Sequence, residues 1–103
     1  MDPNPLVGDL YPRLAAELTT LLNEAGEPGL ARQIPELRLV ADCGCGDDFC
    51  RSFATVEHPE GKPYGPGHRN VILEPEQGML VLDVIGGAEE RIAYVEVLYR
   101  DRA

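Results

Sequence analysis

The side chains of this chain that are best suited to chemistry are three cysteines that stand within eight residues, Cys43, Cys45 and Cys50. Thiolates and imidazoles are the ligands that zinc prefers, and a structural zinc ion takes four of them. The fourth ligand would come from His58 or His68, from an aspartate of the same segment, or from water. The metal site that we expect is Cys43, Cys45, Cys50 and His68, and the cofactor that it implies is zinc.

The spacing of the three cysteines also fits other interpretations. Structural zinc sites usually present two Cys-x-x-Cys pairs, whereas this chain has one tighter Cys-x-Cys pair and a third Cys further on. The thiols could instead be small buried hydrophobic groups, Cys45 and Cys50 could form a disulfide, or the Cys-x-Cys pair could be redox-active. A nucleophilic Cys needs a positioned base, and no fixed spacing in the sequence shows one.

A second segment of interest is rich in glycine and proline and spans residues 58–70. Its glycines allow backbone angles that bring a ligand close, and its histidine and arginine are polar groups that act at neutral pH. The candidates for a ligand- or partner-binding loop are Tyr64, Gly65, Gly67, His68 and Arg69. A plain connection between strands is the simpler interpretation, because the spacing matches neither a phosphate-binding nor a dinucleotide-binding motif.

Two acidic residues, Asp83 and Glu96, interrupt apolar stretches of the sequence. They could form a carboxylate pair for acid–base chemistry. Residues of this kind more often lie on the solvated face of a sheet, and we expect that here. We expect Tyr64, Tyr94 and Tyr99 to be packing residues with one end in water.

Hydrophobic periodicity predicts the elements that position these residues. Apolar residues recur at helical spacing over residues 9–25 and form one stripe: Leu10, Leu14, Leu18, Leu21, Leu22 and Ala25. This predicts one long amphipathic helix capped by its first residue, an aspartate, and ended by Gly26. Pro12 falls in the first turn, where its missing N–H costs little. A shorter helical piece over residues 30–34 is expected to end at Pro35.

From residue 36 the period changes to two, which predicts strands. Residues 36–45 and 50–57 are predicted to form a hairpin that sets Cys45 opposite Cys50, so that all three thiols share one patch. Three further strands are predicted at residues 71–73, 79–85 and 91–99. The fold class is therefore α+β: a long N-terminal helix and a short helix packed on an antiparallel sheet of about five strands, connected as a meander, in one domain of residues 1–103.

The net charge of −9 restricts the partners that this chain would take. It disfavours nucleic acids and anionic membrane surfaces, and it favours a basic protein partner. The N-terminus carries no basic residue and leads into no secretory apolar region, so we expect a cytoplasmic protein. It could be a monomer, or a homodimer formed through an exposed edge strand.

Four stretches of the chain carry a resemblance to other proteins. They are Cys-Gly-Cys-Gly-Asp-Asp-Phe-Cys at residues 43–50, Tyr-Gly-Pro-Gly-His-Arg-Asn-Val at 64–71, Gly-Met-Leu-Val-Leu-Asp-Val at 78–84 and Ile-Ala-Tyr-Val-Glu-Val-Leu-Tyr-Arg-Asp at 92–101. From about residue 10 onward, the chain resembles short bacterial proteins, mainly from actinobacteria, for which no activity is established. The resemblance implies a bacterial, cytoplasmic α+β protein and assigns no residue a role.

Two functions fit the sequence. The first is a non-catalytic binding or interaction domain with a Cys-rich structural metal site, such as an immunity protein that neutralises a basic toxin. The alternative is a small metal- or thiol-dependent enzyme that uses Cys43, Cys45, Cys50 and His68.

Overall fold

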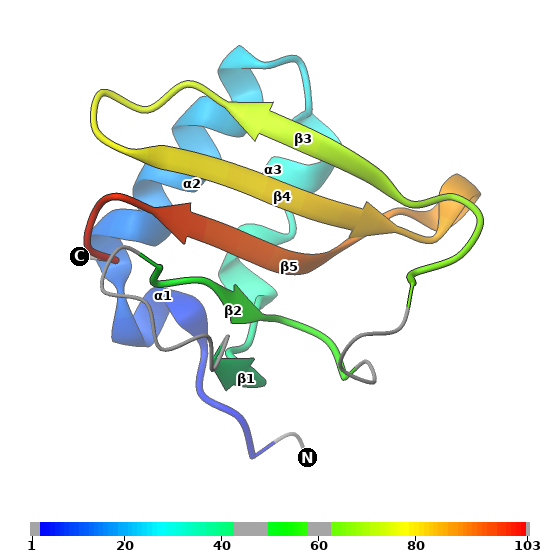
Figure 1. The fold of residues 1–103 in the computed structure, drawn as a ribbon, viewed down its shortest axis with the longest axis horizontal. Helices are drawn as coiled ribbons and strands as arrows, with labels where there is room; N and C mark the ends of the chain where they lie inside the picture. The colour runs from blue at the N-terminus through cyan, green and yellow to red at the C-terminus, as the bar shows by residue number, and fades with distance from the viewer. Residues whose placement is uncertain (1–2, 43–49, 58–62, 103) are drawn as a thin grey trace.

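Helices cover one face of an antiparallel sheet in the computed structural model, which describes residues 3–42, 50–57 and 63–102 (Figure 1). Its elements in chain order are α1 (Val7–Leu10), α2 (Pro12–Glu24), α3 (Pro28–Ala31), the 3-10 helix η1 (Ile34–Glu36), β1 (Ala41–Asp42), β2 (Phe53–Ala54), β3 (Arg69–Leu73), β4 (Met79–Ile85), the 3-10 helix η2 (Gly87–Glu89) and β5 (Arg91–Leu98). The predicted α+β class is confirmed.

The prediction of one helix over residues 9–25 is wrong, because the chain breaks between α1 and α2. Tyr11 leaves the helical region, with φ −136° and ψ 69°, since the ring of Pro12 disfavours helical angles in the residue before it. Pro12 then opens α2, which has 13 residues. Gly26 follows α2 with φ +78°, as expected of a residue that ends a helix. None of the helices in the described ranges is long and apolar enough to cross a membrane.

The second helical piece also differs from its prediction. It consists of α3 and the 3-10 helix η1, and Pro35 lies inside η1 instead of ending the segment before it. Proline is tolerated there because the first residues of a helix have no partner for their N–H groups within the helix.

One hydrophobic core joins the helices to the sheet. The apolar face of α2 contributes Leu14, Leu18 and Leu22, all fully buried. The sheet contributes the inward side chains Phe53, Val71, Leu73, Leu80, Leu82, Val84, Ile92, Val95 and Val97. Leu10 and Ala25 were predicted to share the apolar stripe and are exposed instead. Leu10 belongs to α1, on the other side of the break, so it does not continue the face of α2.

The strand order is β1-β2-β5-β4-β3, and every neighbouring pair is antiparallel. The β3–β4 and β4–β5 hairpins are as predicted. The predicted meander is wrong, because β2 pairs with β5 through Phe53 and Val95, and β3 lies at the edge of the sheet. The two strands at the centre, β4 and β5, are the longest and carry the most buried side chains.

The predicted β1–β2 hairpin exists, with shorter strands than expected. Ala41 pairs with Ala54 and Asp42 with Phe53, which is the register that the sequence predicts. The segment before β1 runs beside the N-terminal segment: the Val7 N–H donates to the Leu37 carbonyl at 2.8 Å. The predicted placement of Cys43 and Cys45 in this hairpin lies outside the described residues.

Candidate functional site

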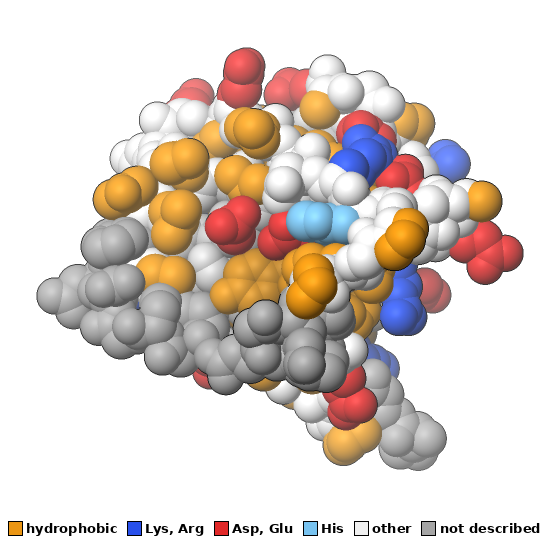
Figure 2. Space-filling view, turned by 45° about the vertical axis from the view of Figure 1, so that its right-hand side comes forward, with side chains coloured by type: hydrophobic (Ala, Val, Ile, Leu, Met, Phe, Trp, Pro, Cys, Tyr) orange, Lys and Arg blue, Asp and Glu red, His pale blue; other side chains and the backbone are white. Residues whose placement is uncertain are grey.

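The sheet face opposite the helices carries polar and aromatic side chains. Because side chains alternate along a strand, the residues between the core positions of β3, β4 and β5 point to this face. The loop before β3 adds further groups to it. The set that we call the outer face consists of Tyr64, His68, Asn70, Ile72, Met79, Val81, Asp83, Tyr94, Glu96 and Leu98. In Figure 2, a histidine lies beside acidic and hydrophobic side chains on this side of the molecule.

Asp83 is the centre of a hydrogen-bonded group on the outer face. Its Oδ1 lies 2.8 Å from His68 Nε2 and accepts a hydrogen bond of 2.6 Å from Asn70 Nδ2. A carboxylate can only accept, so Nε2 carries the proton and, in a neutral ring, Nδ1 is left as an acceptor. The rings of Tyr64 and His68 lie 4.9 Å apart with an interplanar angle of 41°. The group is therefore ordered by contacts on both sides of the imidazole.

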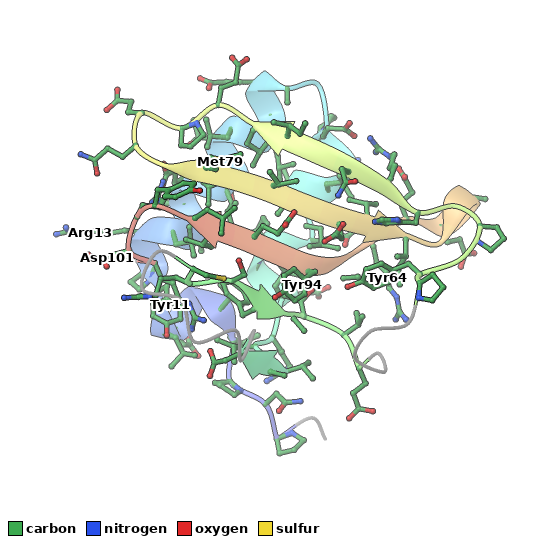
Figure 3. The ribbon with its side chains drawn as sticks, in the orientation of Figure 1. Tyr11, Arg13, Tyr64, Met79, Tyr94 and Asp101 are labelled. Carbon is green, nitrogen blue, oxygen red and sulfur yellow. The ribbon has the colours of Figure 1, made fainter. Side chains whose placement is uncertain are left out.

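The strand register brings these residues together. Asn70 on β3 is directly opposite Asp83 on β4, and Asp83 is directly opposite Tyr94 on β5. Such directly opposed side chains are about 4.5–5.5 Å apart at Cβ. Glu96 is one position further along the same face of β5, diagonal to Asp83. Tyr64 and Tyr94 reach this region from the loop and from β5 (Figure 3).

Burial and negative charge change the acidity of the groups at this site. Burial, followed by the charge of Asp83, raises the pKa of Glu96 above its ordinary value. Burial is also the main cause that raises the pKa of Tyr94 to about 12, and electrostatic interactions with Cys50 and Glu96 add to it. Burial, followed by the charge of Asp83, also raises the pKa of Tyr64. All three shifts favour the protonated form, which is what an anionic and partly desolvated site produces.

The raised pKa of Glu96 makes its negative charge a cost to the folded state at neutral pH. We expect Glu96→Gln to raise the melting temperature at pH 7, because the glutamine carries no charge. The gain should shrink as the pH falls through the folded and then the unfolded pKa of Glu96, since the wild-type side chain then becomes neutral too. Thermal unfolding of both proteins between pH 3 and pH 8 measures this, and equal melting curves across that range would contradict it.

The predicted zinc ligands are only partly placed by the structure. Cys43 and Cys45 lie outside the described residues. Cys50 forms a β-bridge with Leu98, and its Sγ donates to Ser52 Oγ at 3.5 Å. His68 contacts Asp83, whose neighbour Tyr94 lies four residues before Leu98 on β5, about 13 Å along an extended strand. In the ranges that the structure describes, no three His, Cys, Asp or Glu side chains are grouped to hold a metal ion. The zinc site stays a prediction.

Arg69, predicted as part of a ligand-binding loop, is held by two carboxylates. Its guanidinium donates to both carboxylate oxygens of Glu27, at 2.9 Å each, and to both of Glu90, at 2.6 and 2.8 Å. The hydrogen bonds from Arg69 lower the pKa of Glu27 and of Glu90. Arg69 therefore ties β3 to the turn before α3 and to the end of the β4–β5 hairpin. Its charge is satisfied within the chain.

The glycines of the predicted loop shape the approach to β3. Gly65 and Gly67 have φ values of +82° and +88°, which other residues adopt only with strain. The N–H of His68 points back to the Gly65 carbonyl, 3.4 Å away. This turn returns the chain so that His68 comes to lie over the outer face.

Sequence reasoning gave Asn70 no role. It offered Asp83 as one of a carboxylate pair with Glu96 but preferred to place it on a solvated face, whereas its side chain is only 14% exposed. The signal that could have identified both is the short turn between the strands of residues 71–73 and 79–85. Extending that hairpin by one pair beyond Val71 sets Asn70 opposite Asp83. Tyr99, predicted to pack, is 63% exposed.

Comparison of the chain with protein families, with curated proteins and with solved structures finds no match. A function for this chain is therefore argued from the geometry of its outer face.

Proposed function

We propose that this protein is a non-catalytic binding domain whose outer face binds a basic segment of another protein. The observation that carries the proposal is the close association of two carboxylates with exposed apolar side chains on that face. Asp83 and Glu96 lie in a partly desolvated setting, while Ile72 is 71% and Met79 44% exposed. An exposed apolar surface rimmed by polar groups is typical of an interaction site.

Lysine and arginine side chains suit this arrangement chemically. Their aliphatic stems would pack on Ile72 and Met79, and their charged ends would reach the carboxylates of Asp83 and Glu96. The ring of Tyr94 adds a surface on which a cation is attracted. A cation beside Glu96 would offset the burial and the charge of Asp83, which raise the pKa of Glu96. The net charge of −9 would accelerate encounter with a basic partner.

A partner that is itself a basic protein, such as a toxin that this chain neutralises, is the specific form of the proposal. A zinc ion bound by Cys43, Cys45, Cys50 and a fourth ligand would then be structural. Native mass spectrometry of protein made with added zinc tests the metal, because a mass equal to that of the bare chain would exclude it.

The binding experiment uses an eight-residue capped peptide of alternating valine and lysine. We expect Glu96→Gln to weaken binding of this peptide about 5- to 10-fold, because it removes a partly desolvated charge partner. Glu24→Gln, which makes the same change of charge at an exposed position of α2, should weaken it less than about twofold. Isothermal titration calorimetry at low and physiological salt measures both. Equal weakening by the two variants would show that the effect comes from the net charge of the protein alone. That result would overturn the role of the outer face.

The second candidate function is a small metal- or thiol-dependent enzyme that uses Cys43, Cys45, Cys50 and His68. The observation that favours it is the hydrogen bond from His68 to Asp83, which fixes the imidazole tautomer as in a general base. This function requires a thiol with a depressed pKa, because the thiolate is the reactive form. Titration of thiol reactivity against pH separates the two functions, since a midpoint near the ordinary value of about 8.5 would count against the enzyme.

A further inference from the structure

The edge of the sheet formed by β3 is open to pairing. The strand order sets β4 on one side of β3 and no described strand on the other (Figure 1). In an antiparallel sheet, consecutive residues of a strand direct their N–H and C=O groups alternately to one neighbour and to the other. Which residues of β3 point outward therefore depends on the hydrogen bonds across the sheet.

The hydrogen bonds between β5 and the β2 side of the sheet fix that alternation. The Arg51 N–H donates to the Val97 carbonyl at 2.7 Å, and the Thr55 N–H to the Ala93 carbonyl at 2.9 Å. The odd-numbered residues of β5 from 93 to 97 thus face β2. Its even-numbered residues face β4.

The same alternation carries through β4 to β3. On β4, the residues opposite the even-numbered positions of β5 are Asp83, Val81 and Met79, so these face β5. The intervening residues of β4 face β3, where they pair with Arg69, Val71 and Leu73.

Asn70 and Ile72 are left to direct their N–H and C=O groups away from the sheet. In the described ranges, no backbone hydrogen bond from a turn, loop or helix cap reaches these atoms either.

The open edge of β3 lacks the features that usually prevent pairing. The strand contains neither proline nor lysine, and its five pairs with β4 run without a bulge. Its one cation, Arg69, is engaged by Glu27 and Glu90. The side chain of Ile72 is 71% exposed beside the open backbone groups. Edges of this kind accept an added strand in many protein–peptide complexes.

The charges around β3 select the kind of strand that fits. At its first residue Glu27 and Glu90 share the single positive charge of Arg69, which leaves a net negative charge there. Glu74 and Glu76 follow its last residue, and Asp83 lies beside Asn70. A second copy of this chain would bring the same acidic set against its own. A basic strand would meet opposite charge at both ends of the edge.

We infer that β3 binds an extended basic segment as an added strand, through the backbone N–H and C=O groups of Asn70 and Ile72. This inference rests on the proposed function and names the mode in which the partner binds. Up to four backbone hydrogen bonds would fix the segment, and alternate side chains of the segment would lie on the outer face beside Ile72. Lysine or arginine at those alternate positions would complement the acidic side chains nearby.

The test uses the full chain and the same alternating valine–lysine peptide, with two N-methylated forms as additional probes. One form blocks the amides along one edge of the peptide strand, and the other form blocks those along the opposite edge. We expect one form to bind at least about 10-fold more weakly than the unmodified peptide and the other to bind within about twofold of it. In the complex, exchange of the Asn70 and Ile72 amide protons should slow about 10-fold or more.

Two variants of one residue separate backbone pairing from side-chain contact. Ile72→Pro removes an outward N–H that the β3–β4 ladder does not use, so the sheet is expected to persist. We expect at least about 10-fold weaker peptide binding for Ile72→Pro. Ile72→Thr keeps the N–H and should bind within about threefold of the wild type. Thermal unfolding of both variants verifies the fold. Circular dichroism and amide shifts of β4 provide a second readout should the melting temperature of Ile72→Pro fall.

The outcomes distinguish this inference from the proposed function. Equal binding of both N-methylated peptides would overturn the added strand and leave the outer face as the binding site. Amide chemical shifts that change on peptide binding only at Tyr94 and Glu96 would do the same. Binding at Asn70 and Ile72 that is indifferent to Glu96→Gln would support the edge and contradict the outer face. If peptide binding changes the amide chemical shifts neither at Asn70 and Ile72 nor at Tyr94 and Glu96, both the added strand and the outer-face site are overturned. If the chemical shift of the Ile72 amide changes with protein concentration in the absence of peptide, the strand that pairs with β3 comes from a second copy of this chain. That result would overturn the inference of a basic partner.

Discussion

Arg102→Ala is expected to lower the free energy of unfolding by about 2–4 kcal/mol, the range for a buried charged group with several hydrogen bonds. The Arg102 side chain is only 13% exposed. It donates to the carbonyls of Arg51 and Ser52 at 2.6 and 3.1 Å, to Tyr11 OH at 3.1 Å and to Asp42 Oδ1 at 2.8 Å. These bonds join the junction of α1 and α2, strand β1 and the segment just before β2 to the segment after β5. Urea denaturation monitored by circular dichroism measures the loss.

The packing of Arg102 adds to this effect and supplies its controls. The guanidinium carbon lies 5.0 Å from the centre of the Phe53 ring and 5.4 Å from that of Tyr11. Arg102→Lys keeps the charge but loses the planar fork, so an intermediate loss is expected. Arg13 lies on the exposed side of α2 (Figure 3), and Arg13→Ala should cost less than about 0.5 kcal/mol. An Arg102→Ala protein as stable as Arg13→Ala would show that these contacts do not stabilise the fold.

Leu18→Ala is expected to lower the free energy of unfolding by about 2–5 kcal/mol, the range for a leucine removed from a close-packed core. Leu18 is fully buried at the middle of α2, between Leu14 and Leu22. The truncation removes apolar contacts and leaves a cavity that the rigid sheet beneath it fills only in part. Chemical denaturation with an unchanged m-value would attribute the loss to the native state.

Leu10→Ala is the matched control for this substitution. Leu10 was predicted to belong to the same apolar stripe as Leu18, but it lies in α1 and is 45% exposed. We expect it to cost less than about 1 kcal/mol. Similar losses for both variants would contradict the break at Tyr11 and restore the single long helix.

Local patterns in the sequence predicted local structure well. The strand at residues 79–85 was predicted with the bounds that β4 has, and the last strand differs from β5 by one residue. Both have alternating or continuous apolar residues between clear turns, which is information contained within ten residues. The break at Tyr11 was missed because the leucine spacing continues across it, while the proline effect acts on one residue only.

Long-range pairing could not be predicted in the same way. Whether β2 lies beside β3 or beside β5 depends on the difference in free energy between these two pairings. No local pattern in the sequence reports that difference. The site shows the same limit. His68 was recognised as a chemical group, but its partner Asp83 was expected in solvent, since only the β3–β4 register sets Asn70 and His68 next to it.

The central position of β4 and β5 has a consequence for synthesis on the ribosome. The helices are made first, and their apolar face, with Leu14 and Leu18, must be covered by strands that are made only after residue 78. A nascent chain that has reached the loop before β3 therefore exposes this apolar face. Pairing of β1 with β2 alone cannot bury the face. Such an intermediate is a natural substrate for chaperones and proteases. Folding of the helices and of the sheet should therefore be one late event instead of two successive ones.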